Sequence, residues 1–345
     1  MSLGKPIPAK PHPGSLSSTP GFSLHGMYEL TKPRLSILSV FTASLGYLVR
    51  EPLQSDMSIF ISLTIGTALA AGGAAALNQW MERREDALMA RTASRPIPSG
   101  MISPEFAVFF GITLSSLGIY FLWAGTNPWA AILTLATLAI YLLLYTPMKK
   151  RSPYATEIGA ISGALPPLIG WVAAEGAPTT YGWILFGILF TWQLPHFMAI
   201  AWNFREDYSK GGFKLHQLGD PDGKSLARKS LIYSLLLTIF VFSPFILTLE
   251  QSQPGIFYLS SAAVLSLYLL LPAIRFCTSQ NRDHSAKKLF FMGICETTGS
   301  RPLFFRLIFS HEFQTNSEMY HLRSVFLTAH LQESNRGWKP LRRQL

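Results

Sequence analysis

The sequence alternates between long uncharged segments and short segments rich in charged and turn-forming residues. About 20 consecutive apolar residues let an α-helix cross the roughly 30 Å of a bilayer's hydrocarbon core. The long uncharged segments are 35–49, 57–81, 106–148, 158–174, 176–204, 230–249 and 251–274. The segment 106–148 is too long for one crossing and is interrupted by Gly125-Thr-Asn-Pro128, so we assign two helices to it. The pattern predicts an all-α, polytopic membrane helical bundle with eight transmembrane helices.

The distribution of charge gives this bundle an orientation. Only 14% of the residues are charged, against about 25% in soluble proteins, and the formal net charge is +10. Lys and Arg gather before the first predicted helix, in alternate loops after it and beyond the eighth helix, whereas the remaining loops carry only Arg50. This positive-inside pattern places both termini and the basic loops in the cytoplasm. It also accounts for the net charge without nucleic acid binding.

The two ends of the chain differ from the apolar middle. Residues 1–26 are rich in Pro, Ser and Gly, and they lack both acidic residues and the apolar core of a signal peptide. We therefore expect 1–28 to be a disordered cytoplasmic tail, with a mitochondrial targeting segment as the less favoured interpretation. Residues 29–291 form the predicted transmembrane domain. Residues 292–345 form an atypical C-terminal tail without a recognisable ninth span.

A polar stripe follows directly on the second predicted helix. Asn78, Glu82 and Asp86 are spaced at i, i+4 and i+8, and this spacing keeps three side chains on one face of an α-helix. Carboxylate and amide oxygens are ligands that Mg²⁺ accepts while it keeps waters and substrate phosphates. The stripe predicts a magnesium site at the membrane surface. The alternative is a solvated helix end, in which the acidic residues pair with nearby arginines.

Basic residues follow this stripe within one short segment. Arg91 and Arg95 precede Pro96 and Pro98, and two guanidinium groups can bind the oxygens of a pyrophosphate in a forked geometry. The alternative is that they only satisfy the positive-inside rule. The combination of carboxylates and arginines at the mouth of an apolar helix suggests a site for a magnesium-bridged phosphate ester.

A second polar cluster closes the sixth predicted helix. His196, Asn203 and Asp207 fall at i, i+7 and i+11, which keeps them on one helix face. They end at the same membrane face as the first stripe, and two acidic stripes there can hold metal ions around one diphosphate. An ionisable residue within a membrane span is a functional candidate, so we assign His196 to the site. The alternative for His196 is a packed, hydrogen-bonded side chain.

These residues together resemble the UbiA superfamily of intramembrane prenyltransferases. The first matching motif is N-x-x-x-E-x-x-x-D at Asn78, Glu82 and Asp86, where the family usually has Asp in place of Glu82. The second is Gly163-Ala-Leu-Pro-Pro-Leu-Ile-Gly-Trp171. The third joins Trp192-Gln-x-Pro-His196-Phe to Arg205-x-Asp207-Tyr208. The Trp-Gln-x-Pro-His element favours the haem-modifying branch of the family over the quinone and chlorophyll branches.

The resemblance implies a reaction and a set of residues for it. The implied enzyme transfers a farnesyl group from farnesyl diphosphate to a vinyl group of protohaem IX (haem b), making haem O for haem-copper terminal oxidases. Mg²⁺ would be held by Asn78, Glu82, Asp86 and Asp207. The implied catalytic set adds His196 to these four. The implied substrate-binding residues are Arg91, Arg95, Lys149, Arg205 and Tyr208.

The resemblance also implies a setting for the protein. It places the chain in the bacterial inner membrane with the active site on the cytoplasmic side, or less plausibly in the mitochondrial inner membrane. A haem A synthase would be a partner. The chain departs from the family at Phe213-Lys-Leu-His-Gln-Leu and in lacking the family's ninth span. Two alternatives stay open: a prenyltransferase for an aromatic quinone precursor, and a non-enzymatic membrane transporter or assembly factor.

Overall fold

The computed structural model describes residues 23–51, 56–214, 220–247 and 256–298. Most of the predicted N-terminal tail and most of the predicted C-terminal tail lie outside these residues. The described residues are helical, with short turns and no strand between the helices. The elements are α1 (Leu24–Leu30), α2 (Pro33–Arg50), α3 (Met57–Met81), α4 (Arg83–Asp86), α5 (Pro104–Gly125), α6 (Pro128–Ala139), the π-helix η1 (Ile140–Tyr145), α7 (Thr146–Met148), α8 (Ala155–Glu175), α9 (Thr180–Asn203), α10 (Arg205–Lys210), α11 (Lys224–Leu247), α12 (Ile256–Thr278) and α13 (Arg282–Thr298).

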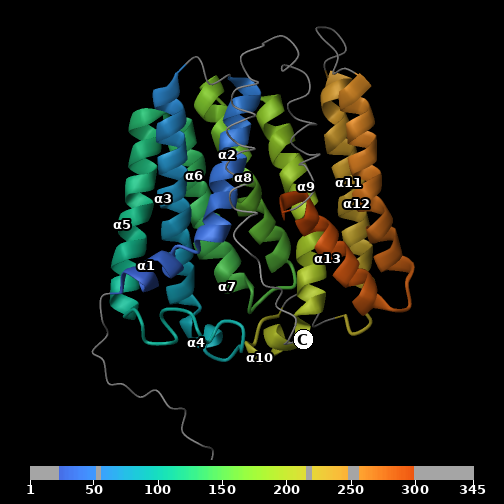
Figure 1. Ribbon diagram of the computed structural model, residues 1–345, viewed down its shortest axis with the longest axis horizontal. Coiled ribbons are helices and arrows are strands. Elements are labelled where there is room, and N and C mark those ends of the chain that lie inside the picture. The colour runs from blue at the N-terminus through green and yellow to red at the C-terminus, as the bar shows by residue number, and fades with distance from the viewer. Residues whose placement is uncertain (1–22, 52–55, 215–219, 248–255, 299–345) are drawn as a thin grey trace, which may run out of the picture.

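The long helices form one bundle with their axes roughly aligned (Figure 1). Among the described residues, seven helical segments are long and apolar enough to cross a membrane: α3, α5, 128–148, α8, α9, α11 and most of α12. The predicted polytopic helical bundle is therefore confirmed. The predicted first span is α2, an 18-residue helix that packs with α3 and α8 but carries Arg34 and Arg50 at its ends. Arg50 pairs there with Glu175, the last residue of α8.

The predicted division of the 106–148 segment is also confirmed. Helix α5 ends at Gly125, and α6 begins at Pro128, whose fixed φ suits the first turn of a helix. The side chain of Asn127 caps α6 by accepting a hydrogen bond from the backbone N–H of Ala130. The local sequence thus ends one span and starts the next within two residues.

Glycines let neighbouring helices approach very closely. A Cβ atom on Gly46 of α2 would lie 1.9 Å from the carbonyl oxygen of Pro167 on α8, and a Cβ on Gly170 would lie 1.7 Å from that of Ala43. Small residues at such crossings allow tight packing between membrane helices. This contact fixes α2 against α8 and, through it, the position of the α1–α2 corner.

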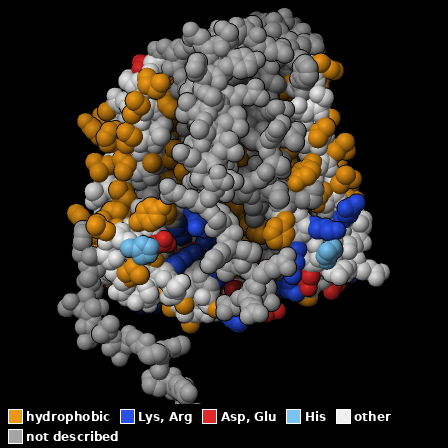
Figure 2. All heavy atoms as spheres, in the orientation of Figure 1, with side chains coloured by type: hydrophobic (Ala, Val, Ile, Leu, Met, Phe, Trp, Pro, Cys, Tyr) orange, Lys and Arg blue, Asp and Glu red, His pale blue; other side chains and the backbone are white. Residues whose placement is uncertain are grey.

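The bundle has an apolar flank and a polar end. On the face shown in Figure 2, hydrophobic side chains cover both flanks, and the Lys and Arg side chains lie towards the lower end. Large hydrophobic residues exposed on the outer helices include Phe109, Trp123 and Ile239. The short helices α1, α4, α7 and α10 gather at the same lower end in Figure 1. The candidate site residues on the loops therefore lie at one end of an otherwise apolar bundle.

Helix α13 occupies a stretch for which the sequence pattern predicted no element. Its 17 residues include a run of only seven uncharged ones, so periodicity gave a weak signal. It packs against α9 and α12, where Phe276, Ala286 and Leu289 are buried together with Trp202. It is not among the described helices that are long and apolar enough to span.

Candidate active site at the polar end of the bundle

The first polar stripe is present and is buried. Asn78 belongs to the last turn of α3, Glu82 breaks the helix with φ −95° and ψ 9°, and Asp86 ends α4. The i to i−4 hydrogen bonds nevertheless continue, from Glu82 N to Asn78 O (3.0 Å) and from Asp86 N to Glu82 O (2.8 Å). These three residues, which we name the Asn78 row, are only 1%, 5% and 0% exposed. A solvated helix end is thus not what the structure shows.

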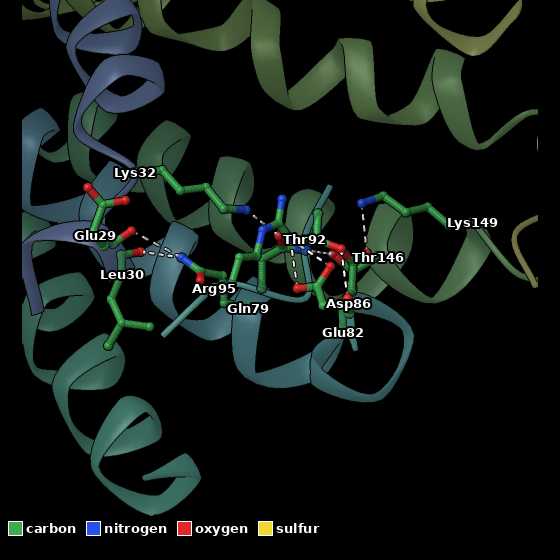
Figure 3. Close-up of polar contacts among 11 residues, drawn as sticks. Glu29, Leu30, Lys32, Gln79, Glu82, Asp86, Thr92, Arg95, Thr146 and Lys149 are labelled. Carbon is green, nitrogen blue, oxygen red and sulfur yellow. Dashed lines mark hydrogen bonds and ion pairs between the residues drawn. The ribbon is translucent and has the colours of Figure 1, made fainter. Parts of the chain in front are cut away.

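Each member of the Asn78 row accepts a hydrogen bond from a basic side chain (Figure 3). Lys32 Nζ donates to Asn78 Oδ1 at 2.9 Å, and Lys149 Nζ donates to Glu82 Oε1 at 2.7 Å. Arg95 Nη1 lies 2.7 Å from both oxygens of Asp86. A buried carboxylate is costly without such partners. The row thus brings two carboxylates together with three cations, an excess of positive charge that suits an anionic ligand.

The pKa values of the two lysines reflect these surroundings. Burial and, next, the nearby Arg95 guanidinium lower the pKa of Lys32 to about 7. Burial alone would lower the pKa of Lys149 as well, but Tyr145 and the Glu82 carboxylate outweigh it and raise that pKa. The environment thus favours the charged form of Lys149 and disfavours an additional positive charge on Lys32. A bound anion would stabilise the charged form of Lys32.

A π-helix at the end of the fourth span positions Lys149. Helix η1 converts into the one-turn α7, and such π-helical segments are frequent at functional sites. Thr146 Oγ1 donates to the carbonyl of Tyr141 (2.8 Å) and accepts from Asn78 Nδ2 (3.2 Å). That second bond turns the Oδ1 atom of Asn78 towards Lys32. Sequence reasoning did not identify Thr146, because its partner Asn78 lies 68 residues away, and it did not identify the π-helix, because that register has no short sequence signature.

The segment between α4 and α5 folds back onto the row. Thr92 Oγ1 donates to the backbone carbonyl of Asp86 at 2.9 Å, and consecutive turns then bring Arg95 back to the carboxylate of Asp86. Buried Ile97 and Ile102 anchor the end of this segment under α1 and α3. The predicted grouping of Arg95 with the acidic residues is therefore present.

The second polar cluster, at the end of α9 and on α10, lies beside the Asn78 row at the same end of the bundle. Helix α9 ends at Asn203, and the short α10 follows. The guanidinium of Arg91 lies 5.3 Å from the ring centre of Phe204 and 5.7 Å from that of Tyr208. Cation–π contacts of this kind are attractive. Arg91 therefore connects the segment after the Asn78 row to the second polar cluster. The sequence analysis predicted that these two parts face one ligand.

Asp207 is half-buried on α10 next to Tyr208. Within the described residues, no hydrogen bond or ion pair to its carboxylate is present. The loop after it returns to the first motif, since the N–H of Lys214 donates to the carbonyl of Lys149 at 2.7 Å. Phe213 is buried there with Met89. Asp207 thus has no hydrogen-bond or ion-pair partner for its carboxylate among the described residues, and the loop that follows it contacts residues around the Asn78 row.

Arg205 and His196 lie away from this grouping. Arg205 Nη1 is 3.2 Å from Asp283 on α13, and its guanidinium stacks on Trp202. His196 lies about 10 Å along the helix axis from Asn203, with its ring between those of Trp192 and Phe290. Among the described residues, its buried Nδ1 atom has no hydrogen-bond partner, and the side chain lines a small apolar cavity. The substrate-binding role of Arg205 stays a prediction.

A further polar side chain links the second and third motifs. Gln193 Nε2 donates to the carbonyl of Ala160 on α8 at 2.7 Å, and the Oε1 atom of Gln193 lies so close to Gly163 that a Cβ there would be 2.5 Å away. The sequence analysis included Gln193 in the third motif but gave it no role. The structure shows that it fastens α9 to the proline-containing part of α8.

The donor atoms fit Mg²⁺ that arrives with its phosphate ligand. The described residues contain no ready-made cluster of three His, Cys, Asp or Glu side chains that could hold a metal ion. Mg²⁺ typically binds through one or two carboxylates together with waters and substrate phosphates. The Asn78 row offers hard oxygens now neutralised by ammonium and guanidinium groups. A divalent cation could bind these oxygens if the ammonium and guanidinium groups paired with the diphosphate instead.

Comparison with known proteins agrees with this fold and identifies the family. The sequence model of the UbiA prenyltransferase family matches residues 39–294, and the chain belongs to this family. It is therefore an integral membrane prenyltransferase. A structure of digeranylgeranylglyceryl phosphate synthase superimposes with a TM-score of 0.68 at 20% identity, covering 83% of this chain and 95% of the other.

Individual relatives narrow the similarity further. A protoheme IX farnesyltransferase from Opitutus terrae is 47% identical over 266 residues, which are 77% of this chain and 88% of the relative. A UbiA homologue from Archaeoglobus fulgidus, bound to DMAPP and Mg²⁺, shares the fold with a TM-score of 0.56 at 14% identity. That comparison covers 78% of this chain and 98% of the homologue.

Proposed function

We propose that this chain transfers a farnesyl group from farnesyl diphosphate to a vinyl group of protohaem IX, forming haem O. The use of a diphosphate as the farnesyl donor is supported chiefly by the buried Asn78 row with its excess of basic partners. The acceptor half rests on the similarity to relatives named protoheme IX farnesyltransferase, of which one is 47% identical. The Trp192-Gln-x-Pro-His196 element supports the same acceptor.

The residues at the polar end would bind and activate the diphosphate. Asn78, Glu82, Asp86 and Asp207 would hold Mg²⁺, which would supply positive charge to the bridging oxygens of the diphosphate. Arg95, Lys149 and the Arg91 guanidinium stabilise the negative charge that grows on the departing group as the carbon–oxygen bond breaks. The support from known structures is that a UbiA homologue binds DMAPP and Mg²⁺ together.

The bundle interior would shield the carbon skeleton. Helices α3, α8 and α9 continue from the polar end as apolar spans, which suits a farnesyl chain and keeps water from an allylic cation. His196 lies in this apolar part, and its Nδ1 atom has no hydrogen-bond partner in the part of the chain that the structure describes. We place His196 with the acceptor, either as a ligand that orients the haem or as a group that takes up a proton.

The setting follows from the charge pattern and the family. We propose that the protein lies in the bacterial inner membrane with the Asn78 row facing the cytoplasm, because the basic loops gather at that end. Its product would pass to a haem A synthase and serve haem-copper oxidases.

The proposed acceptor is tested by separate incubations. Membranes containing the chain are mixed with labelled farnesyl diphosphate, Mg²⁺ and either protohaem or an aromatic quinone precursor. The proposal predicts label in the haem fraction and equimolar release of diphosphate. Label in the aromatic product alone would show that the acceptor is the quinone precursor and not protohaem. No release with either acceptor from folded protein would support a transporter or an assembly factor instead.

A further inference from the structure

The corner between α1 and α2 has an unusual backbone. Lys32, which immediately precedes α2, has φ 45° and ψ 60°, and it is the only non-glycine residue with positive φ among those described. The left-handed region is unfavourable for residues with a Cβ. The following Pro33 restricts Lys32 further, towards extended backbone. Strained backbone of this kind persists only where the surroundings hold it, and it occurs often at ligand sites.

The surroundings that hold this corner come from α3. Gln79 Nε2 donates to the carbonyl of Leu30 at 2.9 Å, and also to that of Glu29 at 3.4 Å. Both Leu30 and the Gln79 side chain are buried. Gln79 therefore fixes the backbone just before Lys32, while its neighbour Asn78 receives the Lys32 ammonium. Figure 3 shows Lys32 and Lys149 approaching the Asn78 row from opposite sides.

Lys32 differs from the other two cations at the row. Lys149 and Arg95 each pair with a carboxylate, Glu82 and Asp86 respectively. Among the described residues, the hydrogen-bond partner of the Lys32 ammonium is the amide oxygen of Asn78, which carries no charge. Of the three basic side chains that pair with the row, Lys32 is therefore the one without a carboxylate partner among the described residues. The ammonium also occupies the oxygen that Asn78 would offer to a metal ion.

We propose that Lys32 contacts the diphosphate directly and exchanges its bond to Asn78 for one to a diphosphate oxygen. The exchange gives Lys32 an anionic partner in place of a neutral one and frees Asn78 Oδ1 for the cation that accompanies the diphosphate. Gln79 is a positioning residue for this contact, because it holds the strained corner. The proposal rests on the proposed function, since it needs a diphosphate substrate at the Asn78 row.

The test uses the full chain purified into lipid nanodiscs. The variants are Lys32→Met, which keeps the side-chain length without charge, and Lys32→Arg, which keeps the charge. Lys224→Met is the matched control, because the Lys224 side chain is exposed and its ion pair among the described residues is a surface one with Asp222. The readouts are the rise in Tm caused by Mg²⁺ with inorganic pyrophosphate, and the KM values for farnesyl diphosphate and for protohaem.

The proposal predicts that Lys32→Met loses most of the pyrophosphate-induced rise in Tm. Its KM for farnesyl diphosphate rises about tenfold or more, as expected for the loss of a charged hydrogen bond. Its Tm without ligand stays close to that of the wild type, and its KM for protohaem is unchanged. Lys32→Arg recovers part of the ligand effect, and Lys224→Met behaves as the wild type.

Three results would overturn the proposal while leaving the proposed function in place. One is an unchanged pyrophosphate effect in Lys32→Met. Another is a large fall in Tm without ligand and an unchanged ligand effect, which would make Lys32 purely structural. The third is a raised KM for protohaem alone, which would place Lys32 on the acceptor. Failure of the wild type itself to respond to pyrophosphate would instead contradict the proposed function.

Discussion

At the scale of single residues, the acidic side chains differ in what their removal costs. Asp86 is fully buried and pairs with Arg95, whereas Asp207 is half-buried and has no hydrogen-bond or ion-pair partner among the described residues. Removing one partner of a buried ion pair destabilises a protein by about 3–5 kcal/mol. Asp86 therefore combines a structural and a functional role, and Asp207 isolates the functional one.

We expect Asp207→Ala to lower prenyl transfer by a factor of about 100 or more, because a metal-bridged diphosphate would lose a ligand. Its Tm should remain that of the wild type. Asp86→Ala should lose the same activity and also melt at a lower temperature. Membrane insertion should be intact in both variants. Activity is measured with labelled farnesyl diphosphate and Tm in nanodiscs, and full activity of Asp207→Ala would remove Asp207 from the metal site.

Arg91 and Arg205 contact different parts of the structure, so we expect opposite effects from their removal. Arg91 stacks on Phe204 and Tyr208 beside the row, whereas Arg205 pairs with Asp283 on α13. From these contacts we expect Arg91→Ala to raise the KM for farnesyl diphosphate several-fold. Arg205→Ala should lower Tm and leave that KM nearly unchanged. The reverse result would support the prediction, made from sequence, that Arg205 binds the substrate.

At the scale of helices, features set by neighbouring residues in the sequence could be predicted, whereas features set by contacts between distant segments could not. The Gly125 to Pro128 break and the spacing of Asn78, Glu82 and Asp86 both follow from neighbours in the sequence, and both are present. The π-helix before Thr146 was not predictable, because its register has no short sequence signature. Helix α13 was missed because its stabilising contacts come from α9 and α12 rather than from its own periodicity.

The tight crossing of α2 and α8 gives a prediction at this scale. Gly170→Ala would place a Cβ 1.7 Å from the carbonyl oxygen of Ala43, so α2 would have to move. We expect a loss of stability of about 1–3 kcal/mol or more and a displaced α1–α2 corner. Gly72→Ala is the matched control, since its Cβ would meet Thr31 at an ordinary 3.4 Å. Equal Tm values for the two variants would contradict this interpretation.

At the scale of the whole molecule, the apolar bundle and the family were predictable and the site was predictable in part. The acidic residues and Arg95 could be grouped because they lie within one short segment. Lys32 was assigned only to the charge pattern, since its partner Asn78 lies 46 residues away. Likewise Arg205 was grouped with its neighbours in sequence, although Asp283 lies on a distant helix. Contacts of this kind depend on the fold, which residue spacing alone does not specify.

The central claim is that this chain makes haem O from protohaem, and the most direct measurement is pigment analysis of cells. The chain, its Asp207→Ala variant and an empty vector are expressed in cells that lack their own haem-farnesylating activity. Haems are then extracted and identified by mass. The account predicts a farnesylated haem only in cells with the unaltered chain. Its absence, in cells whose membranes contain the folded chain, would contradict the account.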